Sequence, residues 1–183
     1  MTTLLLACLL LTLTATTTAN AARTPTVRQY ARTLIVARWN QAEWLAADRR
    51  VADRLDRGLA RTPLAGLGAV LDEEGRRANV SPYLIAAIAG VESSYGAHPC
   101  RSNRRNVWGL ASCKSGYGIP YFTGWRQAIR FQAELLRRGW ISRGVRDVYT
   151  MGRSYCPPCG NGWGAKVAWL MRSLGGTARV TYR

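Results

Sequence analysis

Apolar residues recur along most of the chain at the spacing of α-helices. The pattern predicts one long helix over 25–61, which begins after Thr24-Pro25, a favourable pair for a helix start. Further helices are predicted over about 64–79, 82–96, 123–138, 145–151 and 161–174. Ser81 and Asn161 stand at the starts of two of them and are expected to cap these helices.

The segment 97–122 interrupts the helical pattern. It mixes Gly, Ser, Asn and Pro with arginines and aromatic residues, a composition typical of loops. Any short strands of the protein are expected in this segment. The pattern therefore predicts a mainly α fold with little strand, made of a helical domain with a loop-rich middle and a long N-terminal helix.

The first 21 residues resemble a signal peptide. They contain no charged residue, and the apolar run Leu4–Leu13 has the length of a signal-peptide core and is too short to span a bilayer. Ala19-Asn20-Ala21 supplies the small residues of a cleavage site, so we expect cleavage before Ala22 and no stable membrane span afterwards. The alternative is an uncleaved membrane anchor. We expect a secreted or periplasmic protein.

Four cysteines lie outside that segment: Cys100, Cys113, Cys156 and Cys159. An even number of cysteines in an exported chain indicates two disulfides, and we favour the local pairs Cys100–Cys113 and Cys156–Cys159. A zinc site or a redox-active Cys-Pro-Pro-Cys is the alternative. The twelve residues between the first two cysteines are too many for a metal knuckle, and no βαβ pattern surrounds the second pair.

The chain is strongly basic. It has 26 Lys and Arg against 10 Asp and Glu, a formal net charge of +16, and a single His. Such a charge favours an anionic polymer or surface as partner. The single His excludes a His-rich metal centre, and no Gly-rich phosphate loop is present, so we expect no metal and no organic cofactor.

Glu92 is the only carboxylate between Gly75 and Ala133, a stretch with eight basic residues. It follows Ile85 and Ile88 at helical spacing, so it is expected to face inward with them. Loss of water at a buried carboxyl group favours its protonated form, which is what acid catalysis at a glycosidic oxygen requires. The alternative is a glutamate paired with an arginine at the edge of the loop.

Several motifs occur in the order of a known superfamily. Glu92-Ser93-Ser94-Tyr95-Gly96 is followed by Asn106-Val107-Trp108-Gly109-Leu110 and by Thr123–Ile129, then by Gly152–Tyr155 and Asn161-Gly162-Trp163. This set resembles the lysozyme-like superfamily, closest to bacterial lytic transglycosylases and to glucosaminidase-type cell-wall hydrolases (mannosyl-glycoprotein endo-beta-N-acetylglucosaminidase-like). The resemblance covers about Val80 to Leu174.

The resemblance implies a lysozyme-like α+β fold and roles for individual residues. Glu92 would be the catalytic acid, with Tyr155 across the cleft near the reacting carbon. The substrate-binding residues would be Ser93, Ser94, Tyr95, Asn106, Trp108 and Gly109. Ser93 or Ser94 would orient Glu92 or the sugar. For Trp108 and Tyr155, packing in the core is the alternative.

Two departures from the family pattern concern the cleft. Trp-Gly-Leu-Ala replaces the Gly-Leu-Met-Gln of soluble lytic transglycosylases, and Cys-Pro-Pro-Cys-Gly follows Tyr155. A second catalytic carboxylate is not evident, although Glu134, Asp147 and the cluster Asp72-Glu73-Glu74 are candidates. With one obvious acid, a transglycosylase route is attractive, because the substrate's own hydroxyl closes an anhydro ring.

The sequence thus predicts a signal peptide at 1–21, an N-terminal helical segment at 22–63, a lysozyme-like catalytic domain at 64–176 and a C-terminal tail at 177–183. The expected function is cleavage of the β-1,4-linked glycan strands of peptidoglycan, with anionic wall polymers as partners through charge. Transglycosylase, muramidase and glucosaminidase activities remain open. One alternative is a non-catalytic wall-binding or assembly protein. A nucleic-acid binder is another, against which export, disulfides and the lack of a recognition motif count.

Overall fold

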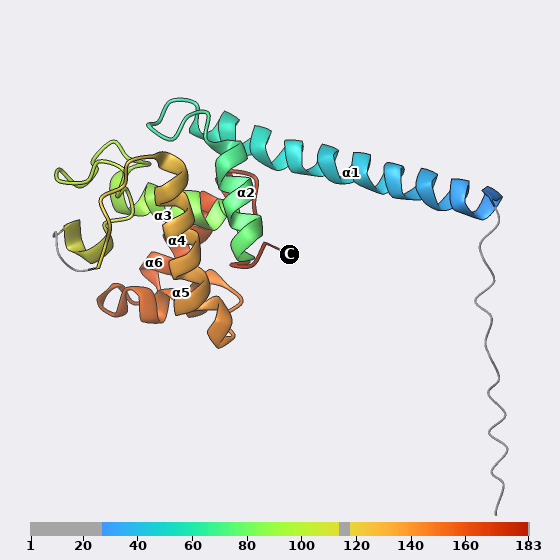
Figure 1. Cartoon of the computed structure of the whole chain (residues 1–183). Helices are drawn as coiled ribbons and strands as arrows, with labels where there is room; N and C mark the ends of the chain where they lie inside the picture. The colour runs from blue at the N-terminus through green and yellow to red at the C-terminus, as the bar shows by residue number, and fades with distance from the viewer. Residues whose placement is uncertain (1–26, 114–117, 183) are drawn as a thin grey trace, which may run out of the picture. The chain divides into compact units, whose positions relative to one another are not determined.

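The computed structural model describes residues 27–113 and 118–182 (Figure 1). The expected signal peptide at 1–21 and its cleavage site before Ala22 lie outside the described residues. No helix within the described ranges is both long enough and apolar enough to cross a membrane.

The chain divides into two compact units, 1–40 and 41–183. Helix α1, Val27–Leu59, runs through the boundary between them. In the first unit α1 exposes Leu34, Ile35 and Val36. In the second unit its last turns bury Leu55 and Leu59 completely. The second compact unit therefore begins inside the segment 22–63 that the sequence assigned to the N-terminal helical part.

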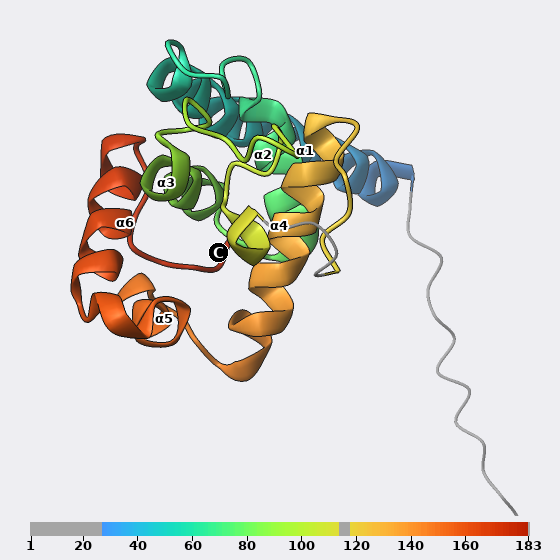
Figure 2. The same ribbon diagram turned by 90° about the vertical axis from the view of Figure 1, so that its left-hand side faces the viewer.

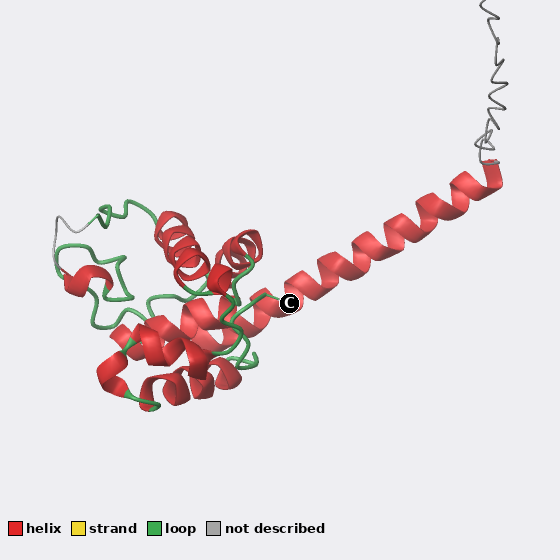
Figure 3. Cartoon of the chain, turned by 90° about the horizontal axis from the view of Figure 1, so that it is seen from below, coloured by secondary structure: helices red, strands yellow, loops and turns green. Residues whose placement is uncertain are grey.

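Helices and loops make up the rest of the second unit, as Figure 3 shows. The α-helices are α2 Gly68–Ala78, α3 Pro82–Ser93, α4 Trp125–Gly139, α5 Val148–Tyr155 and α6 Gly162–Ser173. Within the described residues, the 3-10 helices are η1 Leu110–Cys113, η2 Ile141–Arg143 and η3 Pro157–Cys159. The prediction of a mainly α fold is confirmed.

The short strands expected within 97–122 are absent from 97–113 and 118–122, the parts of that segment that the structure describes. The backbone in this segment has positive φ values, which a strand does not allow. They are 65° at Gly109, 54° at Ala111 and 61° at Cys113. The single β-type pairing among the described residues is an isolated bridge between Asp147 and Arg179. It joins α5 to the C-terminal segment 177–182, where Val180 is fully buried.

Helix α3 is the centre of the second unit. Every residue from Pro82 to Ala89 is buried, because the segment is apolar on all sides. It packs against α2, α4 and α6, while α5 packs against α6 (Figure 2). The carboxyl end of α3, which carries Glu92, lies beside α6 and near the loop that follows α3 in the chain.

The helix ends differ in detail from the prediction. Ser81 and Asn161 stand at helix starts, but neither side chain makes a capping hydrogen bond. Asp147 is the capping residue that the pattern did not single out, and its carboxylate accepts hydrogen bonds from the backbone N–H groups of Tyr149 and Thr150 at 2.9 Å. These bonds lower the pKa of the Asp147 carboxyl group.

Candidate active site

Glu92 lies in the last turn of α3, where the helix emerges from the core. Ile85 and Ile88, which precede it on the same stripe, are fully buried, but Glu92 is exposed. The expectation that Glu92 would be buried is therefore wrong. The reason is its place at the helix end: α3 stops at Ser93, and Ser94 turns the chain with a left-handed conformation of φ 51°.

One oxygen of the Glu92 carboxylate is held by an indole. The Nε1–H group of Trp163, in the first turn of α6, donates a hydrogen bond of 3.0 Å to Glu92 Oε1. No ion pair of Glu92 with an arginine occurs among the described residues. The alternative of an arginine-paired glutamate at the loop edge is thus not what the structure shows.

Gly109 faces the other oxygen of the same carboxylate. A Cβ atom at this position would lie 3.8 Å from Glu92 Oε2, and the φ value of 65° favours glycine. Glycine therefore places no side chain against Oε2. Gly109, which the motif at 106–110 predicted as a site residue, thus lies close to Glu92, and it does so through its backbone.

Two aromatic rings continue from Trp163. Tyr155 stacks on Trp163 with ring centroids 4.3 Å apart and an angle of 21°, and Trp140 lies 5.3 Å from Tyr155 at 37°. Trp140 is fixed by a 2.8 Å hydrogen bond from its Nε1–H to Ser154 Oγ. The row of rings Trp140–Tyr155–Trp163 therefore ends at the Glu92 carboxylate.

The hydroxyl group of Tyr155 stays protonated in this setting. Burial, and secondly the negative charge of Glu92, raise the pKa of Tyr155 far above its ordinary value. The side chain of Gln132 on α4 opposes that rise. Gln132 is fully buried, and neither polar atom of its amide has a well-formed hydrogen bond within the described chain. Tyr155 is thus a neutral hydroxyl group near the acid.

Three residues expected to bind substrate belong to the scaffold instead. Ser93 is 5% exposed. Its hydroxyl group has Ala89 O and Val107 O as acceptors, and it accepts a hydrogen bond from the backbone N–H of Gly96. Asn106 is 2% exposed and pairs through both amide atoms with the backbone of Leu110 at 3.0 Å. Trp108 is 2% exposed and donates to Ile85 O at 2.9 Å. Their polar groups are already used inside the protein, which leaves none for a sugar.

Ser94 and Tyr95 form the turn that follows α3. Both have positive φ values, 51° and 59°. Ser94 is exposed, whereas Tyr95 is half-buried with its ring against Gly90, and burial raises the pKa of its phenol. Of these two, Ser94 alone has a side chain exposed to solvent next to Glu92.

The proposed second carboxylates are all engaged elsewhere. Glu74 is bound by Arg77, Arg126 and Arg130, and Glu73 also pairs with Arg126. Asp72 binds Arg76 and accepts from Tyr182, Glu134 pairs with Arg77, and Asp147 caps α5. The structure therefore places none of these carboxylates beside Glu92 as a free partner.

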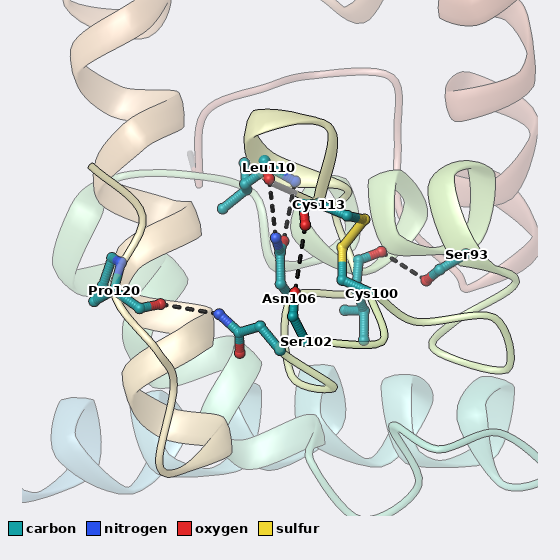
Figure 4. Close-up of a disulfide and its surroundings, with 9 residues drawn as sticks. Ser93, Cys100, Ser102, Asn106, Leu110, Cys113 and Pro120 are labelled. Carbon is teal, nitrogen blue, oxygen red and sulfur yellow. Dashed lines mark hydrogen bonds between the residues drawn. A yellow bond between two sulfur atoms is a disulfide. The ribbon is translucent and has the colours of Figure 1, made fainter. Parts of the chain in front are cut away.

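The loop that carries Gly109 is braced by a disulfide. Cys100 is joined to Cys113, and Cys156 to Cys159, so both predicted pairings are confirmed. Figure 4 shows the first disulfide beside the pairing of Asn106 with Leu110. Asn103 adds a 2.9 Å hydrogen bond to Pro120 O. No group of three or more potential metal ligands occurs within the described residues.

The sequence did not single out Trp163 or Gln132 as members of the site. Gln132 is at helical spacing with Ile129 and Leu136, and Trp163 is at helical spacing with Val167 and Leu170, which indicates burial but not the partner. A polar amide at 132 on an otherwise apolar stripe was the available signal. The structure places Trp163 against the Glu92 carboxylate and the side chain of Gln132 near the Tyr155 hydroxyl group.

Comparison with protein-family models and with curated proteins finds no match for this chain.

Proposed function

We propose that this protein cleaves the glycan strands of peptidoglycan, on a lysozyme-like helical scaffold, with Glu92 as the catalytic acid. The observation that carries the proposal is the Glu92 carboxylate with Oε1 held by the Trp163 indole at the end of a row of aromatic rings. The ordered motifs that resemble lytic transglycosylases and glucosaminidases support the same conclusion. An exported enzyme with a positive surface suits an anionic cell wall.

The hydrogen bond from Trp163 makes the two oxygens of the Glu92 carboxylate different from each other. Oε1 acts as acceptor of the indole N–H, so the proton of the neutral acid sits on Oε2. Gly109 leaves the space at Oε2 free of a side chain. A glycan laid over this exposed carboxyl group displaces water from it. The proton on Oε2 then passes to the glycosidic oxygen as that bond breaks.

Of the three rings, Trp163 is buried, whereas Tyr155 and Trp140 are partly exposed, so a sugar would meet the exposed parts of these two. Aromatic side chains with a few placed polar groups are typical of ligand sites. The neutral hydroxyl group of Tyr155 can donate a hydrogen bond to the substrate near the reacting carbon, where positive charge develops. Trp140 is partly exposed and offers a further ring face.

A single carboxylate favours the transglycosylase route. The candidate second carboxylates bind arginines or cap a helix, so a base for water is not at hand among them. In the proposed reaction, Glu92 protonates the leaving oxygen, and a hydroxyl group of the same sugar attacks the anomeric carbon. That hydroxyl returns its proton to the Glu92 carboxylate, and an anhydro ring closes without water.

Product analysis tests this proposal. The disulfide-intact protein is incubated with purified peptidoglycan, and the soluble fragments are identified by mass spectrometry. Fragments with anhydro ends are expected; reducing ends would instead indicate hydrolysis, and the terminal sugar separates muramidase from glucosaminidase. Tight binding to the wall without soluble fragments would refute cleavage and favour a non-catalytic wall-binding protein.

A further inference from the structure

A cavity of about 410 Å³ lies at the amino end of α3, the opposite end from Glu92. Its walls come from α1, from the start of α3 and from the C-terminal segment 175–182. Glu92 lies ten positions after Pro82, so the two ends of this segment are about 15 Å apart along the helix. This cavity is therefore a separate site from the one built around Glu92.

The charged groups in the cavity wall are all positive. Arg54 and Arg179 line it, and no Asp or Glu does. Neither arginine side chain has an ion pair or hydrogen bond within the described part of the chain. Asp72 is tied to the wall through a hydrogen bond that it accepts from Tyr182, and it is paired with Arg76. The two guanidinium groups are thus available to a ligand.

The start of α3 adds polar groups without partners. Ser81 lines the cavity and is 6% exposed, and its hydroxyl group makes no hydrogen bond in the described chain. The backbone N–H of Tyr83, in the first turn, also lacks a partner there. Pro82 between them has no N–H to offer. A buried hydroxyl group and a free N–H at a helix amino end form a ready site for an anion.

A second cavity of about 400 Å³ shares Arg179 and Thr181 with the first. Arg137 and Arg146 line this second cavity, which also contains no Asp or Glu in its wall. Both arginines donate to backbone carbonyl oxygens, so their positions are fixed while their charges are not neutralised. The positively charged surface of the first cavity therefore extends into the second cavity, through Arg179 to Arg137 and Arg146.

We propose that the cavity between Arg54, Arg179 and Ser81 binds the phosphate group of a larger ligand. Two guanidinium groups and a helix amino end suit a doubly charged oxyanion, which arginine binds through paired hydrogen bonds. The volume falls in the range of sites for small molecules and exceeds what a phosphate group alone requires. Val51, Pro82 and Tyr182 supply apolar surface for the remainder of the ligand. The site is independent of the catalytic proposal.

Titration of ¹⁵N-labelled protein with inorganic phosphate at constant ionic strength tests the site. The Tyr83 amide is the reporter, because its N–H is the free donor of the helix start. We expect a saturable shift of this signal, and at least a tenfold weaker affinity in the double variant Arg54→Gln/Arg179→Gln. The control Arg57→Gln/Arg172→Gln removes the same charge from α1 and α6 outside the cavity and should bind as the wild type does.

The proposal would be overturned if phosphate produced no saturable shift, if acetate produced the same saturable shift, or if both double variants were weakened equally. Glycerol 3-phosphate and a glycerol phosphodiester then separate the sources of the group. Binding of the monoester alone supports a free phosphorylated molecule, and binding of the diester supports a phosphate-linked polymer. Failure of both esters to bind would contradict a phosphate-bearing ligand.

Discussion

At the scale of the residue, one hydrogen bond distinguishes Glu92, the proposed catalytic acid, from an ordinary surface glutamate. Glu92 is exposed, and what orients it is the indole N–H of Trp163. The sequence identified Glu92 by its isolation among basic residues, but not its exposure, because helical periodicity does not say how far the core extends beyond the last turn. It also assigned Ser93, Asn106 and Trp108 to substrate, whereas their polar groups bind the protein's own backbone.

Substitution Trp163→Phe tests this orientation. The ring and its stacking on Tyr155 are retained, while the hydrogen bond to Glu92 is lost. A hydrogen bond to a charged group contributes about 1.5–3 kcal/mol, so the rate of glycan cleavage should fall roughly 10- to 100-fold. The control is Trp169→Phe on the same helix, whose ring is 63% exposed. Release of soluble fragments is the measurement, and equal rates in the two variants would contradict the assigned role.

At the scale of the element, close contact between α5 and α6 positions the aromatic rings. A Cβ atom at Gly164 would lie 2.9 Å from Val148 O and 3.0 Å from the Cα atom of Tyr149, so only glycine fits there. The sequence predicted both helices from their periodicity. It did not predict that their backbones touch, because a glycine in a helix pattern indicates weak propensity as readily as close packing.

Substitution Gly164→Ala should therefore destabilise the protein by about 1–3 kcal/mol, because the helices are forced apart. The matched control is Gly162→Ala in the same helix, where a Cβ atom would meet nothing within 4 Å. Urea unfolding measures both variants. Equal stability of Gly164→Ala and the control would show that the contact between α5 and α6 is loose.

A second link between elements predicts a pH dependence of stability. Glu74 on α2 is buried and bound by Arg126 and Arg130 of α4, and the hydrogen bond from Arg130 is the main cause of its lowered pKa. A carboxyl group with a lowered pKa in the folded state stabilises the protein above its unfolded pKa of about 4.3. That contribution is lost as the pH falls through the lower, folded value.

Unfolding free energies measured from pH 7 down to pH 3 should thus fall more steeply for the wild type than for Glu74→Gln. The variant itself is expected to be less stable at pH 7, by roughly 3 kcal/mol, because it leaves buried groups without their charged partner. Glu73→Gln, at a side chain that is 62% exposed, should keep the wild-type slope. Identical slopes for all three proteins would assign the acid sensitivity to other groups.

At the scale of the whole molecule, composition and pattern predicted the mainly α fold, the loop-rich middle and both disulfide pairings. These features follow from local periodicity and cysteine spacing. The position of the acid relative to α6 and the cationic cavity at the other end of α3 follow from tertiary packing. Arg54, Ser81 and Arg179 lie far apart in the sequence, and no local pattern relates them. The net charge of +16 favours an anionic partner, but it does not say which surface such a partner would contact.

The central claim is that the carboxyl group of Glu92 carries the proton for glycan cleavage, and Glu92→Gln tests it most directly. The amide keeps the size of the side chain and an oxygen that can accept the Trp163 N–H, but it cannot protonate a leaving group. The rate of fragment release from purified peptidoglycan should fall by about 10²- to 10⁴-fold, with the unfolding midpoint and wall binding unchanged. Release of fragments at the wild-type rate by Glu92→Gln would show that Glu92 is not the catalytic acid.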